Sequence, residues 1–188
     1  MSKNIINNWL SSDYHMGHFN ILKYDKRDFK TIEEHDIHLI QTHNKYVKPH
    51  DKFYFLGDFS FAKKDKTEYY LSQLNGDKYF IKGNHDDKDT IALYKQYGTF
   101  MGKMEEIRIG EQGITLCHFA QRIWNKSHRG NWSLHGHSHD SLENKPYGKS
   151  MDVGVMTAKR LTGEYRPFEF NELKEIMDKR PIIKIDDH

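Results

Sequence analysis

The sequence has a single cysteine, Cys117, among its 188 residues. An intrachain disulfide is therefore impossible, which favours a reducing compartment. No apolar run approaches the roughly 20 residues that a membrane-spanning helix requires. Residues 1–5 also lack the apolar segment of a secretory signal. These absences predict a cytoplasmic protein with no membrane partner.

A strong charge of one sign is absent as well. The 29 basic and 27 acidic residues leave a net charge of +2 at pH 7. This value is too small to indicate a nucleic-acid partner by itself. The chain shows no internal repeat and no linker, and its length predicts a single domain, residues 1–188, with a substantial buried core.

Histidine is over-represented, with 13 copies. This is more than a protein core or a protein surface requires. Several are expected to be ordinary, and the polar surroundings of His35, His38 and His50 predict that these three are exposed to solvent. The histidines that need an explanation lie in short polar motifs.

Five such motifs occur, each directly after an apolar, strand-like run. In chain order they are Asp13-Tyr14-His15, Gly57-Asp58, Gly83-Asn84-His85-Asp86, Cys117-His118 and Gly136-His137-Ser138-His139. Their aspartate, asparagine and histidine side chains supply the oxygen and nitrogen ligands that suit hard or borderline divalent metals. The set is large enough to fill two adjacent metal sites.

The apolar pattern predicts alternating strands and helices at first, and mostly strands later. Thr31 and Glu34 have the spacing of a capping box before the longest helix, and Asn171 is the predicted N-cap of the last one. The predicted strands are residues 5–10, 53–56, 79–81, 105–109, 114–117, 132–134, 150–155 and 182–185, and the predicted helices are residues 32–46, 67–74, 90–97 and 172–179. This order of elements indicates a layered α/β sandwich.

The motifs are expected to converge in space. Open α/β sheets bind ligands at the carboxyl ends of their strands, so the polar ends of neighbouring strands meet at one edge. Asp13 and His15, like His137 and His139, can present two donors from one turn. Asp58 is alone in its loop and is the natural bridge between two metals. Each motif alone has an ordinary explanation as a turn, a helix cap or a buried histidine; their conjunction in this order does not.

With their flanking residues, the motifs resemble the calcineurin-like metallophosphoesterase superfamily, and most closely its small, cap-free, single-domain members. The pattern of that superfamily is Asp-x-His, Gly-Asp, Gly-Asn-His-Asp, His and Gly-His-x-His, in that order. The similarity runs from about residue 9 to about residue 155, and includes residues 12–21, 56–60, 74–76, 81–86 and 124–139. It implies an α/β/β/α sandwich of the metallo-dependent phosphatase type.

The resemblance also implies a role for each matching residue. Asp13, His15 and His139 would hold one metal ion, and Asn84, His118 and His137 the other, with Asp58 bridging both. His85 would donate a proton to the leaving group and Asp86 would orient it. The two divalent ions, with manganese expected first and iron, nickel, cobalt or zinc as alternatives, would polarise the phosphoryl oxygens and lower the pKa of a bridging water.

The substrate is less well defined by the sequence. Candidate substrate contacts are His18, Asn20, Arg27, Arg122 and Arg129, because arginine binds phosphate oxygens bidentately; roles in ordering loops or in a solvated basic loop fit these residues equally well. The resemblance favours a small phosphoester, for example a nucleotide, and diesters over monoesters. A nuclease acting on DNA or RNA is the alternative enzyme, which the low net charge disfavours. A non-catalytic interaction scaffold predicts eroded ligand positions, whereas all are filled here.

Overall fold

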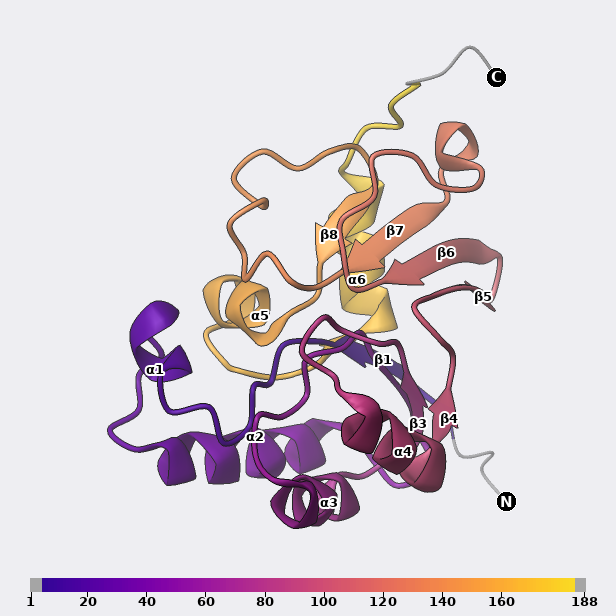
Figure 1. Ribbon diagram of the computed structural model, residues 1–188. Helices are drawn as coiled ribbons and strands as arrows, with labels where there is room; N and C mark the ends of the chain where they lie inside the picture. Colours follow the sequence, from indigo (N-terminus) through magenta and orange to yellow (C-terminus); the bar gives the residue numbers. More distant parts are fainter. Residues whose placement is uncertain (1–4, 185–188) are drawn as a thin grey trace.

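The computed structural model describes residues 5–184 and contains two β-sheets that lie face to face (Figure 1). The first sheet has the strand order β4-β3-β2-β1-β9, and the second has the order β5-β6-β7-β8. The strands of the first sheet are β1 (Asn8–Ser11), β2 (Lys52–Phe55), β3 (Asp77–Phe80), β4 (Thr99–Phe100) and β9 (Phe168–Glu169). Those of the second are β5 (Met104–Ile109), β6 (Gln112–Cys117), β7 (Trp132–His135) and β8 (Ser150–Asp152).

Six α-helices and one short 3₁₀ helix accompany the sheets within residues 5–184. They are α1 (Ile21–Tyr24), α2 (Ile32–Tyr46), α3 (Lys64–Gln73), α4 (Lys88–Tyr97), α5 (Val155–Thr162), α6 (Phe170–Asp178) and the 3₁₀ helix η1 (Ser127–Arg129). In Figure 1, α2, α3 and α4 lie on the side of the first sheet that faces away from the second sheet. None of the helices in the described part of the chain is long and apolar enough to cross a membrane.

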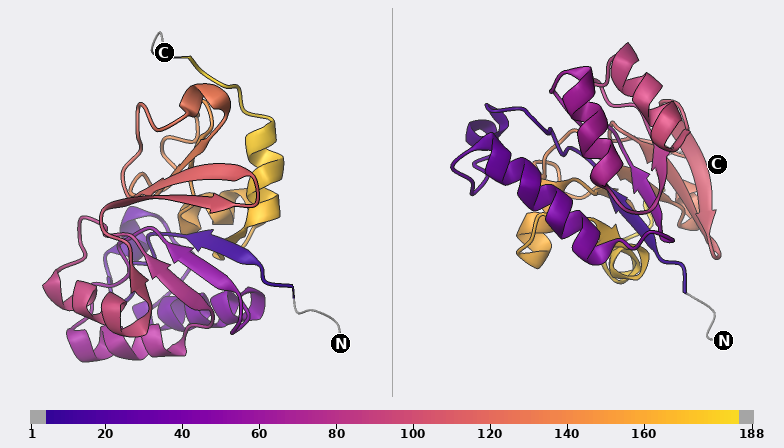
Figure 2. Two further views of the ribbon diagram at one scale, coloured as in Figure 1. Left: turned by 90° about the vertical axis from the view of Figure 1, so that its right-hand side faces the viewer. Right: turned by 90° about the horizontal axis from the view of Figure 1, so that it is seen from below.

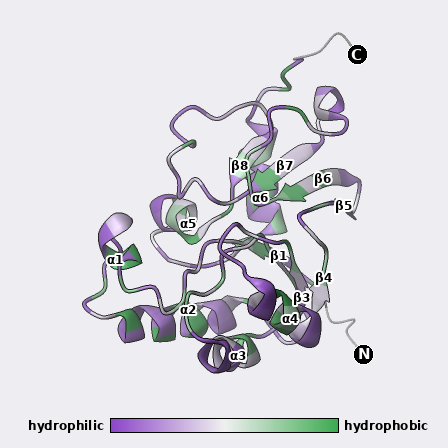
Figure 3. Ribbon diagram, viewed as in Figure 1, coloured by the Kyte–Doolittle hydropathy of each residue, from purple (hydrophilic) through white to green (hydrophobic). Residues whose placement is uncertain are grey.

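Alternation along the central strand β2 divides its side chains between two cores. Phe53 and Phe55 pack with residues of α2, α3 and α4 in the first core, whereas Tyr54 and Leu56 pack against the second sheet in the second core. Helix α6 contacts β9 and β1 and closes the second core. The views in Figure 2 show the resulting layers, and Figure 3 shows hydrophobic residues on β6 and β7 and hydrophilic residues on the outer sides of the helices. The layered α/β sandwich that the sequence predicts is thereby confirmed.

Parallel pairing places the ends of the strands at one edge. β1, β2, β3 and β4 are parallel, and so are β6, β7 and β8. Backbone hydrogen bonds extend this order into the loops that follow. Asp13 N–H donates to the Gly57 carbonyl over 3.1 Å, and Gly136 N–H donates to the His118 carbonyl over 3.0 Å. The five polar motifs therefore leave their strands side by side.

Several predicted elements differ from the observed ones. The strand predicted for residues 5–10 is β1 (Asn8–Ser11), and the helix predicted for residues 67–74 is α3 (Lys64–Gln73). The strand predicted for residues 150–155 ends at Asp152, because Gly154 is the N-cap of α5. Helix α6 is capped by a capping box of Glu169 and Glu172, and not by Asn171. Residues 182–184 of the predicted last strand are not in a strand, and Ile185 lies outside the described residues.

Candidate metal centre

Three of the predicted ligands meet at one point beyond the ends of β1 and β7. The Nε2 atoms of His15 and His139 lie 3.0 Å apart, and they lie 3.7 Å and 3.5 Å from Oδ1 of Asp13. His139 directs its other ring nitrogen, Nδ1, at Oδ1 of Asp25 over 2.8 Å. If that Nδ1 carries the proton and donates it to Asp25, the Nε2 lone pair of neutral His139 points inward at other acceptors.

A second group lies beside the first. His118 Nδ1 lies 2.7 Å from the Leu56 carbonyl, to which it donates, so its Nε2 faces Asn84 Oδ1 at 2.8 Å and Asp58 Oδ2 at 3.3 Å. Nδ1 of His137 lies 2.9 Å from the same Asn84 oxygen. As in the first group, atoms with lone pairs face one another, an arrangement that requires a proton or a cation between them.

Asp13 joins the two groups. Two sets of donor atoms lie within 4.8 Å of one another, Asp13 with His15 and His139, and Asp13 with Asp58 and His118. Asp13 Oδ1 is buried without a hydrogen-bond partner, while Oδ2 accepts from the Ser12 hydroxyl and from His137 N–H. A buried, unpartnered carboxylate oxygen is costly unless a cation binds it. The residues present therefore fit a pair of adjacent divalent ions, and Asp58 as their bridge stays a prediction.

The backbone is strained at these positions. Non-glycine residues rarely adopt positive φ, and such residues concentrate at functional sites. Eight do so within residues 5–184, and five of the eight are predicted metal ligands: Asp13, His15, Asp58, His137 and His139, with φ between 43° and 66°. The surrounding loops thus hold the donor side chains in directions that a relaxed loop would not give them.

Two glycines permit this packing. A Cβ atom on Gly83 would lie 2.1 Å from Asp58 Oδ1, and a Cβ atom on Gly136 would lie 2.5 Å from Asp13 Oδ2. Both contacts are far closer than van der Waals packing allows. Glycine at these two positions therefore lets the backbone approach the two carboxylates.

The electrostatics of the cluster favour positive charge. Burial lowers the pKa of His139, but the nearby charges of Asp13 and Asp25 and the hydrogen bond to Asp25 outweigh burial and raise the pKa to about 10. In the same way, burial lowers the pKa of His118, while Asp58 and Asp13 raise it to about 9. Burial raises the pKa of Asp13, yet the imidazoles of His139 and His15, 3.5 and 3.7 Å from its Oδ1, hold this pKa well below its usual value. The carboxylates thus stabilise a cation between the imidazoles, which is the property that a metal site needs.

A buried polar network supports the first group from behind. Asp25 accepts from His139 and, through Oδ2, from Nε and NH2 of Arg27 at 3.0 and 2.8 Å. The Arg27 guanidinium also donates to the backbone carbonyls of Asp13 and Tyr14. Arg27 therefore ties the 13–15 loop to the carboxylate that orients His139. Sequence reasoning missed Asp25, since it lies in a charged stretch with no motif to distinguish it.

This network corrects two expectations from the sequence. Arg27, a candidate substrate contact, is only 4 % exposed, and its guanidinium N–H groups donate to acceptors within the protein. His35 is fully buried and accepts from Arg27 NH1 at 2.8 Å, although polar surroundings predicted exposure; His38 is half-buried and His50 is exposed. The polar residues around Arg27 and His35 in the sequence form a hydrogen-bond network inside the protein, and not a solvated surface.

His85 and Asp86, which were expected to act together, have different surroundings in the structure. The His85 side chain is exposed, its ring centroid lies 6.1 Å from that of His15, and its backbone N–H donates to Asp58 Oδ1 over 2.9 Å. Asp86 is buried and accepts from the N–H groups of Gly83, Asp58 and Phe59 and from the Tyr94 hydroxyl. Asp86 therefore holds the two ligand loops together, and its hydrogen bonds do not orient the His85 ring.

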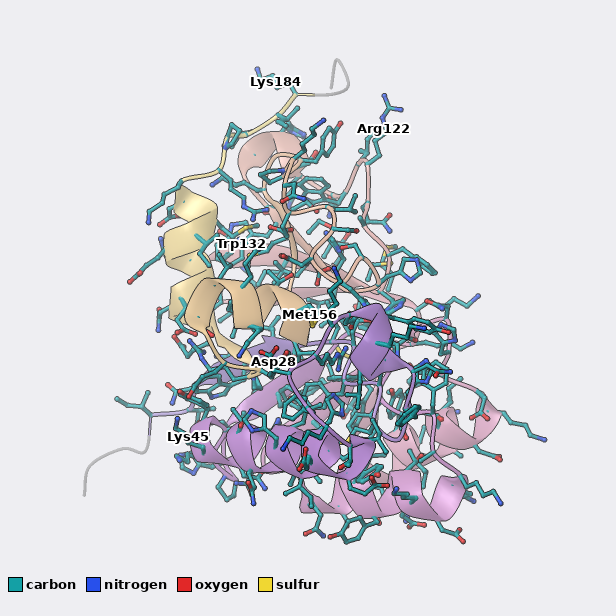
Figure 4. All side chains as sticks on the ribbon, turned by 90° about the vertical axis from the view of Figure 1, so that its left-hand side faces the viewer. Asp28, Lys45, Arg122, Trp132, Met156 and Lys184 are labelled. Carbon is teal, nitrogen blue, oxygen red and sulfur yellow. The ribbon has the colours of Figure 1, made fainter. Side chains whose placement is uncertain are left out.

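The remaining candidate substrate contacts are dispersed. His18 stacks on Phe61 with ring centroids 4.2 Å apart, at the margin of the metal cluster, and Asn20 is exposed at the start of α1. Arg122 projects away from the body of the protein (Figure 4), and exposed Arg129 donates to His128 over 3.2 Å. Within residues 5–184, no hydrogen bond or ion pair links either arginine to the cluster.

Comparison with known proteins finds similar sequences and a similar fold. No family model matches the chain. An uncharacterized protein of Methanocaldococcus jannaschii is 30 % identical over 183 residues, which cover 94 % of each chain. The gene 66 protein of Mycobacterium phage D29 is 29 % identical over 163 residues, covering 72 % of this chain and 80 % of that protein. A crystal structure of a protein of unknown function from Aquifex aeolicus shares the fold, with a TM-score of 0.71 and 21 % identity over 92 % of this chain and 100 % of that one.

Proposed function

This chain belongs to the same family as the Methanocaldococcus jannaschii protein, and we propose that it is a dimetal phosphoesterase of the calcineurin-like superfamily. One observation carries the proposal: the inward-facing ring nitrogens of His139 and His118 point at carboxylate and amide oxygens, and Asp13 Oδ1 between the two groups is buried without a partner. The order of the five sequence motifs supports the same conclusion.

The resemblance to the superfamily assigns the metal ligands, and this arrangement supports the assignment. Asp13, His15 and His139 would hold one divalent ion, and Asn84, His118 and His137 the other, with Asp58 shared between them. Two such ions supply stabilisation of the phosphoryl oxygens and activation of water at neutral pH. Mixed oxygen and nitrogen donors suit manganese, our first choice, and also iron, nickel, cobalt and zinc.

His85 is our candidate for the proton donor to the leaving group. Its side chain is exposed beside the cluster, and its ring centroid lies 4.7 Å from that of Phe61, whose packing restricts the imidazole. The backbone bond from His85 N–H to Asp58 Oδ1 ties this donor to the metal-binding loop. A general acid at this position contributes typically about 10²–10⁴-fold to the rate.

A phosphodiester is the substrate that we favour. We also propose a cytoplasmic location. The buried free thiol of Cys117 supports the second point, because it is compatible with reducing conditions. A purely structural scaffold would have no use for a buried carboxylate oxygen without a partner, and strain at five donor positions is costly without a function.

The test is metal-dependent hydrolysis. Protein stripped of metal and then loaded with Mn²⁺ should hydrolyse bis(p-nitrophenyl) phosphate faster than p-nitrophenyl phosphate, and the stripped protein should hydrolyse neither. His118→Ala should abolish turnover, while the control His50→Ala, which removes an exposed histidine outside the cluster, should not. Absence of hydrolysis by the wild type after loading with Mn²⁺, Ni²⁺ or Co²⁺ would refute the proposal.

A further inference from the structure

We propose that the site binds a phosphodiester that joins two nucleosides, with one arm of the substrate in each of two cavities, one lined by His85 and the other by Asn84. This inference rests on the proposed function and specifies its substrate as a dinucleotide or a short single strand of nucleic acid. Each cavity combines an exposed phenyl ring with two lysines.

The first cavity adjoins the proposed proton donor. It has a volume of about 450 Å³, and its lining includes His85, Phe61, Lys63 and Lys64. Phe61 is 41 % exposed although it is a large apolar residue, and it packs against the imidazoles of His15 and His18, with centroids 5.3 and 4.2 Å away. Since His85 stands at this cavity, the cavity would take the leaving-group arm.

The second cavity adjoins a predicted ligand of the other metal. It has a volume of about 380 Å³ and is lined by Asn84, Phe119, Lys82 and Lys103, among others. Phe119 is 46 % exposed, and its ring centroid lies 4.5 Å from that of His137. A phenyl ring that is held by a site imidazole and left open to solvent is a stacking surface for a base.

The four cavity lysines, Lys63, Lys64, Lys82 and Lys103, supply the charge for flanking phosphates. The ion pairs of lysine within residues 5–184 involve Lys45, Lys159 and Lys174, and so leave all four unpaired. Two acidic residues also line the first cavity. The carboxylate of Asp87 caps α4, where it accepts from the N–H groups of Asp89 and Thr90 and keeps its negative charge, so that Asp87 and Asp89 are two opposing charges in this cavity.

A diester can occupy both cavities, whereas a monoester can occupy only one. A monoester places one group in one cavity and leaves the other Phe and its lysines without a contact. A dinucleotide with phosphates at both ends would put one base and one phosphate into each cavity. Such a substrate needs no extended basic face, which agrees with the net charge of +2.

The experiment compares three substrates on the Mn²⁺-loaded protein: bis(p-nitrophenyl) phosphate, the thymidine dinucleotide, and the same dinucleotide phosphorylated at both ends. We expect kcat/KM to be highest for the phosphorylated dinucleotide. Phe61→Leu and Phe119→Leu keep apolar bulk but remove the ring, and each should lower kcat/KM for both dinucleotides about fivefold or more, mainly through KM. Lys64→Ala and Lys103→Ala should each reduce the advantage of the phosphorylated dinucleotide by roughly two- to fivefold.

The matched control is Lys66→Ala, which removes a lysine of α3 that does not line either cavity. It should leave the preference between the dinucleotides unchanged. Metal content and circular dichroism of each variant exclude loss of the site or of the fold. Hydrolysis of bis(p-nitrophenyl) phosphate without any preference for dinucleotides would overturn this inference alone, whereas no hydrolysis of any substrate would overturn the proposed function.

Discussion

Replacing Asp25 by asparagine should weaken one metal site and spare the other. The Asp25 side chain is only 8 % exposed, accepts from His139 Nδ1 over 2.8 Å, and pairs with Arg27 over 2.8 Å. An asparagine of the same size loses the negative charge and turns an amide N–H₂ toward either His139 or Arg27, both of which are donors. Loss of such a support for a ligating histidine typically costs about 10–100-fold in metal affinity, which is about 1.4–2.7 kcal/mol.

Calorimetric titration of the metal-free protein with Mn²⁺ measures this effect. For Asp25→Asn we expect one of the two binding steps to weaken by this factor, while the step that belongs to Asn84, His118 and His137 keeps its affinity. Asp28→Asn is the matched control, because Asp28 lies in the same charged stretch but its exposed carboxylate pairs with Lys159 at the surface (Figure 4). Wild-type binding by Asp25→Asn, or an equal loss in Asp28→Asn, would refute the role given to this network.

Three further changes test other parts of the account. His85→Ala should lower kcat about 10²–10⁴-fold with both metals retained, and loss of metal by titration would mean that its role is misassigned. Gly83→Ala should reduce metal binding because its Cβ would meet Asp58 Oδ1 at 2.1 Å, whereas Gly102→Ala, with open space around it, should cost only backbone strain. Burial lowers the pKa of His43 from 6.5 to about 4, so between these values the unfolded state binds the additional proton and stability falls as pH decreases, by about 3 kcal/mol in total. Urea unfolding from pH 7 to pH 4 should show this loss in the wild type and a smaller one in His43→Phe, and parallel curves would contradict it.

Sequence patterns predicted the long elements of the fold and failed on the short ones. Helix α2 has the predicted bounds, because Thr31 supplies the N-cap, which accepts from Glu34 N–H, and the apolar residues follow a helical spacing. β4 and β9 have two residues each, and so few residues carry no period that a pattern can detect. α5 was missed because residues 150–155 were interpreted as one strand, whereas the strand ends at Asp152 and Gly154 caps the helix that begins at Val155.

The site was predicted at the level of motifs, because each motif ends a strand and parallel strands bring their ends together. All seven predicted ligands lie within two adjacent groups. The supporting residues were not predictable in the same way. Arg27 and Asp25 act through backbone carbonyls and one histidine that lies 114 residues away from Asp25. Such contacts depend on the folded geometry and cannot be read from the sequence. Arg27 was therefore interpreted as a phosphate-binding residue, which is a common role for arginine.

The most direct test of the central claim is anomalous X-ray scattering from crystals loaded with Mn²⁺. The account predicts two peaks about 3.5–4 Å apart, one beside Asp13, His15 and His139 and the other beside Asn84, His118 and His137, with the Asp58 carboxylate between them. A single peak, or ordered ions bound away from these seven side chains, would contradict it.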